Sequence, residues 1–207
     1  DVFMSHIAII GATGRAGGQL LAEALRRGHQ VTAIARHASS LPAQAKVTPK
    51  DVDVLDAAAL QHAVSGVDAV FSAAHFSAIP ASAIINPVQA AGVRRLLVVG
   101  GAGSLFVAPG LKVIDTPNFP AEYKAEAAAG GVYLDTLRET QDLDWSFLSP
   151  SALFLDGERT GQFRLGKDEL LVGADGKSWI SFADYAIAFM DELERPAHSR
   201  QRFTVGY

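Results

Sequence analysis

The sequence contains no cysteine among its 207 residues, which excludes disulfides, thiolate nucleophiles, iron–sulfur clusters and cysteine zinc sites. Its six histidines show no metal-ligand spacing, so we predict no metal. The net charge of −4 argues against a nucleic-acid partner. No run approaches the roughly 20 apolar residues of a membrane span, and the N-terminal segment lacks the regions of a signal peptide. We expect a cytoplasmic globular protein without a membrane contact, with Met4 as a candidate natural start.

The order of elements predicts an α/β fold with a doubly wound parallel sheet. Short apolar runs that suit buried strands alternate with segments whose apolar residues have helical spacing. Helices on both faces of such a sheet make a Rossmann-like architecture. The expected strands are 6–10, 31–35, a third that ends at 52–54, 67–72, 95–99 and 144–148. The expected helices are 16–27, 57–64, 84–91 and 122–141, the last interrupted at Gly130-Gly131.

The last third of the chain has a different composition. Prolines predict a loop at 105–120, and glycines beyond Pro150 predict a small β-rich excursion with strands at 162–165 and 170–172. Ser181 and Asp184 have the spacing of a capping box and predict the start of a closing helix. Because no linker or repeat divides the chain, we expect one domain over 1–207, with a nucleotide-binding core at 1–150 and the excursion and closing helix at 151–207.

A glycine-rich turn joins the first expected strand to the first expected helix. Its G-x-x-G-x-x-G pattern has the strand–turn–helix context of a dinucleotide-binding site. Glycines there permit a tight turn, a close backbone approach to a pyrophosphate and close packing of helix on strand, while the helix N-terminus offers amides to the anion. The alternative is that these glycines only form a tight turn. The candidate cofactor-binding residues are Gly11, Thr13, Gly14, Arg15, Ala16 and Gly17.

Arg36 follows the second expected strand, where NAD-selective folds carry an acidic residue. A guanidinium pairs with a 2′-phosphate through two parallel hydrogen bonds, whereas a carboxylate repels it. Arg15 adds positive charge in the turn itself. We therefore predict that the cofactor is NADPH in preference to NADH, against the alternative that Arg36 is an ordinary surface residue.

Two further segments follow strands at the same expected edge of the sheet. Asp53 is placed to meet the adenine amino group, with Val54 against the ring. Ala73 and Ala74 are small enough for the backbone to pass close to the ribose and the nicotinamide. His75 is a candidate ligand contact, although a lone histidine after a strand is more often a loop residue.

The sequence resembles the atypical short-chain dehydrogenase/reductases, and within them the group called NADH-flavin reductases, which is related to flavin-type biliverdin reductase and NmrA-like proteins. The resemblance covers essentially the whole chain and implies NAD(P)H binding and, by the group's label, flavin reduction. It is carried by the glycine turn, Arg36, Asp53-Val54, 100–104, 144–150, 157–161 and 175–181.

The catalytic Tyr-x-x-x-Lys pair of the larger dehydrogenase family is broken here. Ala127 stands four residues after Tyr123, and Leu137 stands four residues after Tyr133. Reducing a ketone leaves an alkoxide that demands a positioned proton donor, whereas a reduced flavin or quinone delocalises its charge. The broken pair therefore favours a flavin or quinone acceptor.

Three hydroxyl residues are candidates for the acceptor site: Ser104, which matches the family's serine position, Tyr123 and Ser151. The alternative for each is a loop or capping hydroxyl. Flavin-type biliverdin reductases carry a histidine where Ser151 falls, which argues against bilin reduction.

Together these features predict an NADPH-dependent oxidoreductase, monomeric or homodimeric, that passes hydride to a flavin or quinone-like small molecule. The flavin is expected as a substrate rather than a tightly bound cofactor. One alternative is a non-catalytic NADP(H) sensor of the NmrA-like kind. A third hypothesis is a sugar-nucleotide epimerase or dehydratase, although such enzymes usually need the Tyr/Lys pair and a larger C-terminal domain.

Overall fold

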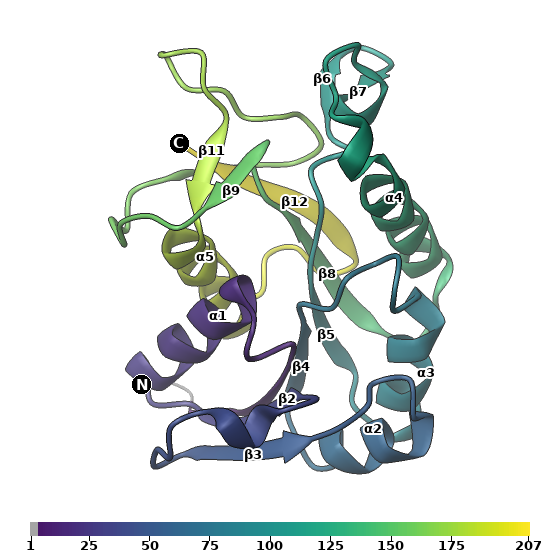
Figure 1. Cartoon of the computed structure of the whole chain (residues 1–207), viewed down its shortest axis with the longest axis vertical. Helices are drawn as coiled ribbons and strands as arrows, with labels where there is room; N and C mark the ends of the chain where they lie inside the picture. The colour runs from purple at the N-terminus through teal and green to yellow at the C-terminus, as the bar shows by residue number, and fades with distance from the viewer. Residues whose placement is uncertain (1–3) are drawn as a thin grey trace.

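An eight-stranded sheet lies at the centre of the computed structural model, which describes residues 4–207 (Figure 1). Residues 1–3, which precede the candidate start Met4, lie outside the described residues. All neighbouring strands of this sheet pair in parallel except β10, and the Rossmann-like fold class predicted from the sequence is confirmed. The spatial order is β10 (Arg164–Gly166), β12 (Gln201–Gly206), β8 (Asp144–Ser149), β5 (Arg95–Val99), β4 (Ala69–Ser72), β1 (His6–Ile10), β2 (Gln30–Ala35) and β3 (Val47–Asp51).

Helices cover both faces of the sheet and explain why its central strands are apolar throughout. α1 (Arg15–Arg26) and α5 (Phe182–Glu194) pack on one face, and α2 (Ala57–Val64), α3 (Ala81–Ala90) and α4 (Lys124–Glu139) pack on the other. Successive side chains of a strand point to opposite faces. In β1, Ile7 and Ile9 therefore join the α1–α5 layer, while Ala8 and Ile10 join the other layer.

The third strand differs from the prediction. The sequence predicted that it ends at 52–54, whereas β3 spans Val47–Asp51 and the chain has left the sheet by Val52. β3 lies at the edge of the sheet and contains Pro49, which pairs opposite Ala33. An edge strand tolerates proline because one of its sides needs no ladder hydrogen bonds. The strand is also largely exposed, so it lacks the apolar run that marked the central strands.

Two features of the segment from 105 to 141 differ from the sequence prediction. The predicted loop at 105–120 contains a short hairpin of β6 (Phe106–Ala108) and β7 (Leu111–Lys112), with Gly110 at φ 73° in its turn. The helix that follows is not interrupted, because α4 runs through Gly130-Gly131. Gly130 packs on the Phe76 ring, where a Cβ would come within 3.0 Å of that ring. The glycine thus serves close packing instead of breaking the helix.

The last third of the chain both adds strands to the main sheet and forms a separate pair. β9 (Leu153–Leu155) and β11 (Trp179–Ser181) make a two-stranded parallel sheet. β10 overlaps the predicted strand at 162–165, but the predicted strand at 170–172 is irregular. β12, which the sequence did not predict, inserts between β8 and β10. Ser181 caps α5 as predicted, since the Asp184 amide donates to Ser181 Oγ at 3.0 Å. The other half of the predicted capping box is replaced, because the Asp184 carboxylate accepts from the Thr160 and Gly161 amides and the Ser181 amide donates to the Tyr207 hydroxyl.

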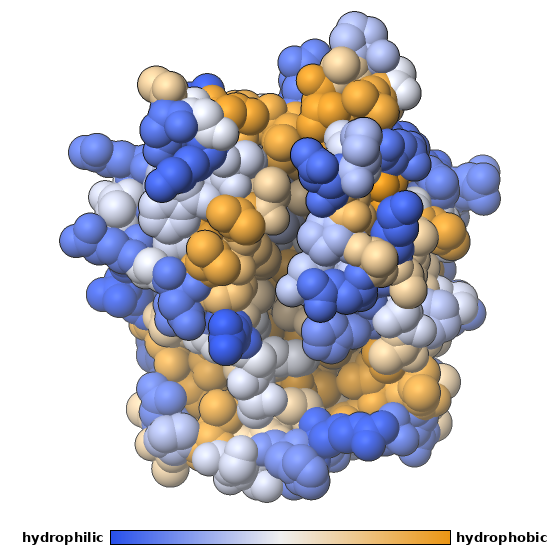
Figure 2. Space-filling model, turned by 45° about the horizontal axis from the view of Figure 1, so that its top comes forward, coloured by the Kyte–Doolittle hydropathy of each residue, from blue (hydrophilic) through white to orange (hydrophobic). Residues whose placement is uncertain are grey.

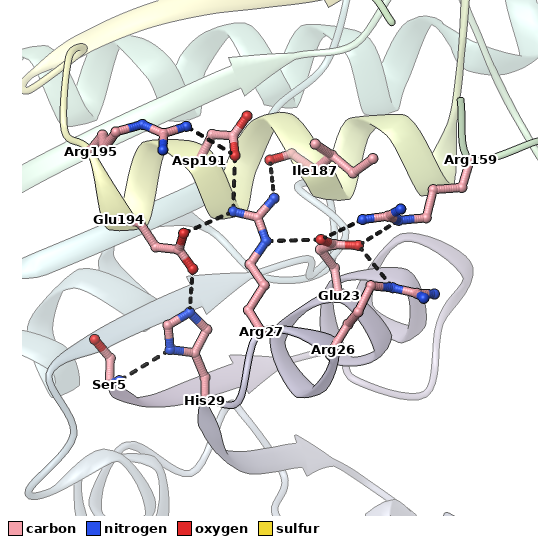
Figure 3. Close-up of polar contacts among 10 residues, drawn as sticks. All are labelled: Ser5, Glu23, Arg26, Arg27, His29, Arg159, Ile187, Asp191, Glu194 and Arg195. Atoms are coloured by element: carbon pink, nitrogen blue, oxygen red, sulfur yellow. Dashed lines mark hydrogen bonds and ion pairs between the residues drawn. The ribbon is translucent and has the colours of Figure 1, made fainter. Parts of the chain in front are cut away.

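A polar cluster joins α1, α5 and the segment that follows β9 (Figure 3). At its centre the carboxylate of Glu23, which is 3% exposed, accepts hydrogen bonds from Arg27 Nε at 2.8 Å and from Arg159 Nε at 2.9 Å. Arg27 also reaches across to α5, where its Nη1 donates to Asp191 at 2.9 Å and to Glu194 at 3.1 Å. The cluster therefore ties the C-terminal excursion, through Arg159, to the helix that begins at the glycine-rich turn.

Candidate functional site

The glycine-rich turn lies between β1 and α1, where close backbone contacts require residues without side chains. Gly11 has φ 81°, a conformation that favours glycine, and a Cβ there would approach the Ala73 carbonyl oxygen to 3.1 Å. A Cβ at Gly17 would lie only 2.0 Å from the Gly11 carbonyl oxygen. A Cβ at Gly14 would meet Gly11 at 3.4 Å, which is an ordinary contact. Gly17 is thus the position with the strictest requirement for glycine.

The N-terminus of α1 is built to receive an anion. Its N-cap is Gly14, and in the described part of the chain no side chain caps the helix and no acidic residue lies in its first turn. Helix N-termini carry unpaired amides and a partial positive charge. Thr13 and Arg15 are exposed beside these amides, and Ala16 is half-buried in the first turn. The predicted pyrophosphate contacts therefore share one small surface.

Arg36 and His37 are exposed immediately after β2, on the corner beside the glycine-rich turn. Gly11 donates its amide to Ile34 in the same strand at 2.8 Å, which holds the turn and this corner together. The acidic residue that pairs with Ala35 across the sheet is Asp51, and its carboxylate already accepts from the Ser39 amide and hydroxyl at 2.8 Å each. The corner therefore presents a guanidinium to solvent.

Asp53 and Val54 lie beyond the end of β3 instead of at its last positions. The Asp53 side chain is exposed and accepts from the Leu55 amide at 3.0 Å, an Asx turn that leads into α2. Val54 is half-buried and packs against the core beneath α2 and α3. The structure thus explains both residues locally, and it leaves one carboxylate oxygen of Asp53 for a ligand.

The segment after β4 lies directly beside the glycine-rich turn. The Ala73 amide donates to Ile10 at 2.9 Å, and Ala73 is the nearest neighbour that a side chain at Gly11 would meet. Ala74 is half-buried, whereas the His75 side chain is 87% exposed. The strand order reverses between β1 and β4, which is where ligands bind in open α/β sheets. The fold therefore brings these two predicted segments together.

A cavity of about 600 Å³ opens where β5 and β8 end. Figure 2 looks onto this edge and shows a hollow between two lobes, with hydrophobic residues gathered at its upper end. The cavity also borders the segment after β4, through Phe76. Its walls are formed by Phe76, Gly100, Gly101, Ala102, Gly103, Val113, Thr116, Asn118, Phe119, Pro120, Tyr123, Glu126, Ala127, Pro150, Ser151, Ala152, Leu153 and Phe154.

The three predicted acceptor-site hydroxyls have different surroundings. Tyr123 lines the cavity and is 59% exposed at the start of α4. Ser151 also lines it, but its side chain is buried and its Oγ donates to the Val205 carbonyl at 2.8 Å. Ser104 is not among the lining residues, and its Oγ accepts from Arg202 at 2.8 Å. The structure thus brings Tyr123 and Ser151 together and leaves Ser104 outside.

Close packing accounts for the broken Tyr/Lys pair. Ala127, one helical turn after Tyr123, lies against Gly103, where a Cβ would come within 2.9 Å of the Ala127 Cβ. The start of α4 therefore approaches the glycine segment after β5 too closely for a long side chain between them. Lys124, which is next to Tyr123 in the sequence, is exposed and is not among the residues of the cavity wall.

Glu126 is a feature of the cavity that the sequence analysis missed. Its carboxylate accepts from the Phe76 amide at 2.7 Å, and from the Ser77 amide at 2.9 Å and hydroxyl at 2.7 Å. Partial burial acts to raise the pKa of Glu126, but the hydrogen bonds from Ser77 and Phe76 outweigh it and lower the pKa below its usual value. Glu126 is therefore an ionised group that fastens α4 to the segment after β4.

A family model described as NAD(P)H-binding matches residues 11–195, which include the glycine-rich turn and the cavity. The chain belongs to the NAD(P)H-binding family. The resemblance to atypical short-chain dehydrogenase/reductases predicted from the sequence is confirmed. Within this family, the curated relative "Uncharacterized protein YwnB" of Bacillus subtilis (strain 168) is 47% identical, over 96% of this chain and 97% of its own.

Three solved structures share the fold over nearly their whole length. A "putative exported protein" from Burkholderia pseudomallei is 46% identical with a TM-score of 0.90 and covers 99% of this chain and 100% of its own. A "putative epimerase" from Bacteroides thetaiotaomicron is 42% identical with a TM-score of 0.94, covering 99% and 98%. A "putative NADH-flavin reductase" from Streptococcus pneumoniae TIGR4 is 35% identical with a TM-score of 0.85, covering 98% and 99%. The family is thus an NAD(P)H-binding, oxidoreductase-like one, whose described relatives carry different names.

Within residues 4–207, no group of three or more acidic or histidine residues is placed to hold a metal ion. Within the same residues, no helix is long and apolar enough to cross a membrane. The cytoplasmic location stays a prediction from the sequence, since one relative is described as exported.

Proposed function

We propose that this protein is an NADPH-dependent oxidoreductase that transfers hydride to a flavin or a quinone-like ring. One observation carries the proposal: Tyr123 lines the largely apolar cavity after β5 and β8, but Ala127 stands where a lysine would complete the pair. A flavin or hydroquinone anion is delocalised and takes its proton from water, whereas an alkoxide needs a positioned donor. The arrangement therefore suits the first kind of acceptor and argues against the epimerase or dehydratase alternative.

The residues of the turn fit a dinucleotide. The space at Gly11 and Gly17, which a Cβ would fill, lets the backbone come close to a pyrophosphate, and the N-terminus of α1 binds its charge. Arg36 is placed to pair with a 2′-phosphate, and Ala73 with Ala74 leaves room for the ribose and nicotinamide. Bound NADPH supplies the hydride, and the chain supplies position and electrostatics.

The cavity walls hold the acceptor ring. Phe76, Phe119 and Phe154 offer aromatic surface for stacking and exclude water, and the Tyr123 hydroxyl offers one hydrogen bond. The orientation of two rings then provides most of the rate acceleration, since no covalent or proton-relay group is required. The proposal treats flavin as a substrate that passes through this open cavity, with monomer and homodimer both compatible.

Replacing Tyr123 by phenylalanine tests the role of its hydroxyl. We expect kcat/KM for a quinone to fall by about tenfold or less, because a lost hydrogen bond weakens acceptor binding without removing a required proton donor. A general acid would contribute about 10²–10⁴-fold. The measurement is the loss of NADPH absorbance with quinone and flavin acceptors. A fall of more than about 100-fold would show that Tyr123 donates the proton, and would favour a carbonyl substrate.

Replacing Arg36 by alanine tests the choice of cofactor. We expect the dissociation constant for NADPH to rise by about 10- to 100-fold, because one charge-assisted pair with the 2′-phosphate is lost. The dissociation constant for NADH is the internal control and should change less than about threefold, since NADH has no phosphate at that position. Titration of the protein fluorescence measures both. Equal affinities of the unsubstituted protein for the two nucleotides would contradict the prediction.

A screen of flavin, quinone and dye acceptors with NADPH tests the activity itself. Oxidation of NADPH with at least one acceptor is the expected result. Tight NADPH binding without turnover by any acceptor would overturn the proposal and favour the NmrA-like sensor, whose partner would then be sought on an exposed apolar patch.

A further inference from the structure

The charge of the acceptor cavity is unusual for a site that serves phosphorylated flavins. Of its wall residues, only Tyr123 and Glu126 are ionisable, and within residues 4–207 no lysine, arginine or histidine lines it. Anionic ligands are normally met by arginine, lysine or free backbone amides. The one charged group here is instead a carboxylate.

That carboxylate is held in place by the fold. Both oxygens of Glu126 accept hydrogen bonds from the segment after β4, so the side chain cannot rotate away without breaking three contacts. Its side chain is 37% exposed, and Glu126 is one of the residues that line the cavity. The charge is therefore a permanent part of the wall, not a mobile surface charge.

The cations near the cavity lie outside its wall. His75 approaches Glu126, with its Nδ1 3.8 Å from Oε2, but its side chain is 87% exposed and is not among the wall residues. Lys112 lies over the Phe106 ring at 5.9 Å, outside the wall. Arg202 is buried behind Ser104 and Ser149 and pairs with Asp168 at 3.0 Å. By contrast, Arg15 and Arg36 are exposed at the opposite, nucleotide end of the site.

We infer that the acceptor cavity selects an uncharged ring, such as an unsubstituted quinone, and discriminates through Glu126 against acceptors that carry an anionic group on the ring. This inference rests on the proposed function. The reaction moves one hydride from the reduced nicotinamide to the quinone, which takes one proton from water and leaves as the hydroquinone, while the cofactor leaves oxidised. An anionic acceptor brings its charge toward the Glu126 carboxylate and loses its water without gaining a cationic partner.

Naphthoquinone and its ring sulfonate form a matched pair for the test, because they differ by one charge at the ring. The sulfonate withdraws electrons and is intrinsically easier to reduce, so a preference for the parent compound cannot come from reactivity. We expect kcat/KM for naphthoquinone to exceed that for the sulfonate by about tenfold or more. Riboflavin and FMN are a second pair, with a smaller expected difference because the phosphate sits at the end of a flexible chain.

Two substitutions locate the cause of the preference. Glu126→Gln removes the charge, and Asn118→Lys adds a cation at an exposed wall position that does not contact Glu126 in the hydrogen-bond network. We expect each to reduce the ratio of the two kcat/KM values by about tenfold. A ratio near one in the unsubstituted protein, or a ratio that neither substitution changes, would overturn the inference.

Binding gives a readout that does not depend on turnover. Calorimetric titration of NADP-loaded protein with each naphthoquinone should show the same preference for the uncharged compound. If the protein binds naphthoquinone selectively yet oxidises no NADPH, the proposed function fails while the charge selectivity stands. If NADPH is oxidised and the sulfonate binds as well as its parent, the selectivity fails while the proposed function stands.

Discussion

Replacing Gly17 by alanine is expected to weaken NADPH binding by about 100-fold and to lower the free energy of unfolding by about 3 kcal/mol. The added Cβ would lie 2.0 Å from the Gly11 carbonyl oxygen and 2.7 Å from the carbonyl carbon, so the turn and α1 must move apart. Backbone atoms cannot rotate out of the way as a flexible side chain can. The displaced turn would then misplace the amides that we propose bind the pyrophosphate.

Gly18 provides a matched control one residue further along the same helix. A Cβ there has the Ala12 carbonyl oxygen as its nearest neighbour, at 3.8 Å. Gly18→Ala should therefore raise the free energy of unfolding by about 0.5–1 kcal/mol, because alanine is the better helix former, and should leave NADPH binding nearly unchanged. Urea unfolding and fluorescence titration measure both variants. Wild-type affinity in the Gly17→Ala protein would show that the turn is not the cofactor site.

Removing the carboxylate of Glu23 is expected to lower the free energy of unfolding by about 3 kcal/mol in the Glu23→Ala variant. Glu23 is almost fully buried between two guanidinium groups, and its loss leaves Arg27 and Arg159 facing one another without their shared partner (Figure 3). Arg26 also lies near this carboxylate, at 3.5 Å, but its side chain is 58% exposed. Arg26→Ala is therefore the control, with an expected change within about 0.5 kcal/mol.

The same cluster predicts a dependence on pH. Burial acts to raise the pKa of Glu23, but hydrogen bonds from Arg159 and Arg27 outweigh it, so the pKa in the folded protein lies below its usual value. The stabilisation is then fully present above the pKa of the unfolded carboxyl, about 4.3, and is lost as the pH falls through the lower folded value. The difference between wild type and Glu23→Gln in urea unfolding should be constant from about pH 6 to 8 and shrink below about pH 4. A constant difference down to about pH 3 would contradict this.

The fold of the central sheet was predictable because its strands are buried on both faces. Residues such as Ile7 to Ile10 form continuous apolar runs, and such runs alternating with amphipathic helices allow few other arrangements. β12 escaped prediction for the opposite reason. Its Arg202 is a charged residue in a buried strand, and only contacts with Ser104, Ser149 and Asp168, 34 to 98 residues away, make that placement stable.

The candidate site likewise has one part that the sequence predicted and one part that it did not. The glycine-rich turn and Arg36 were predictable because their geometry follows from a short segment of contiguous sequence. Glu126 was not, since its partners Phe76 and Ser77 lie about 50 residues away in the sequence. Ser104 occupies the position expected from the family resemblance, yet the buried Arg202 engages its hydroxyl. Local patterns thus predict the geometry of the proposed nucleotide site better than the surroundings of the proposed acceptor cavity.

β12, which comes after every other strand of the described chain, lies inside the sheet between β8 and β10, so the sheet is complete only after β12 has been made. The strands that carry the glycine-rich turn and the segment after β4 precede β12 by more than 100 residues, so they leave the ribosome and are able to associate before β12 is made. The wall of the acceptor cavity must wait, because Ser151 is held by Val205 in the last strand. A nascent chain would therefore complete the proposed nucleotide site before the proposed acceptor cavity.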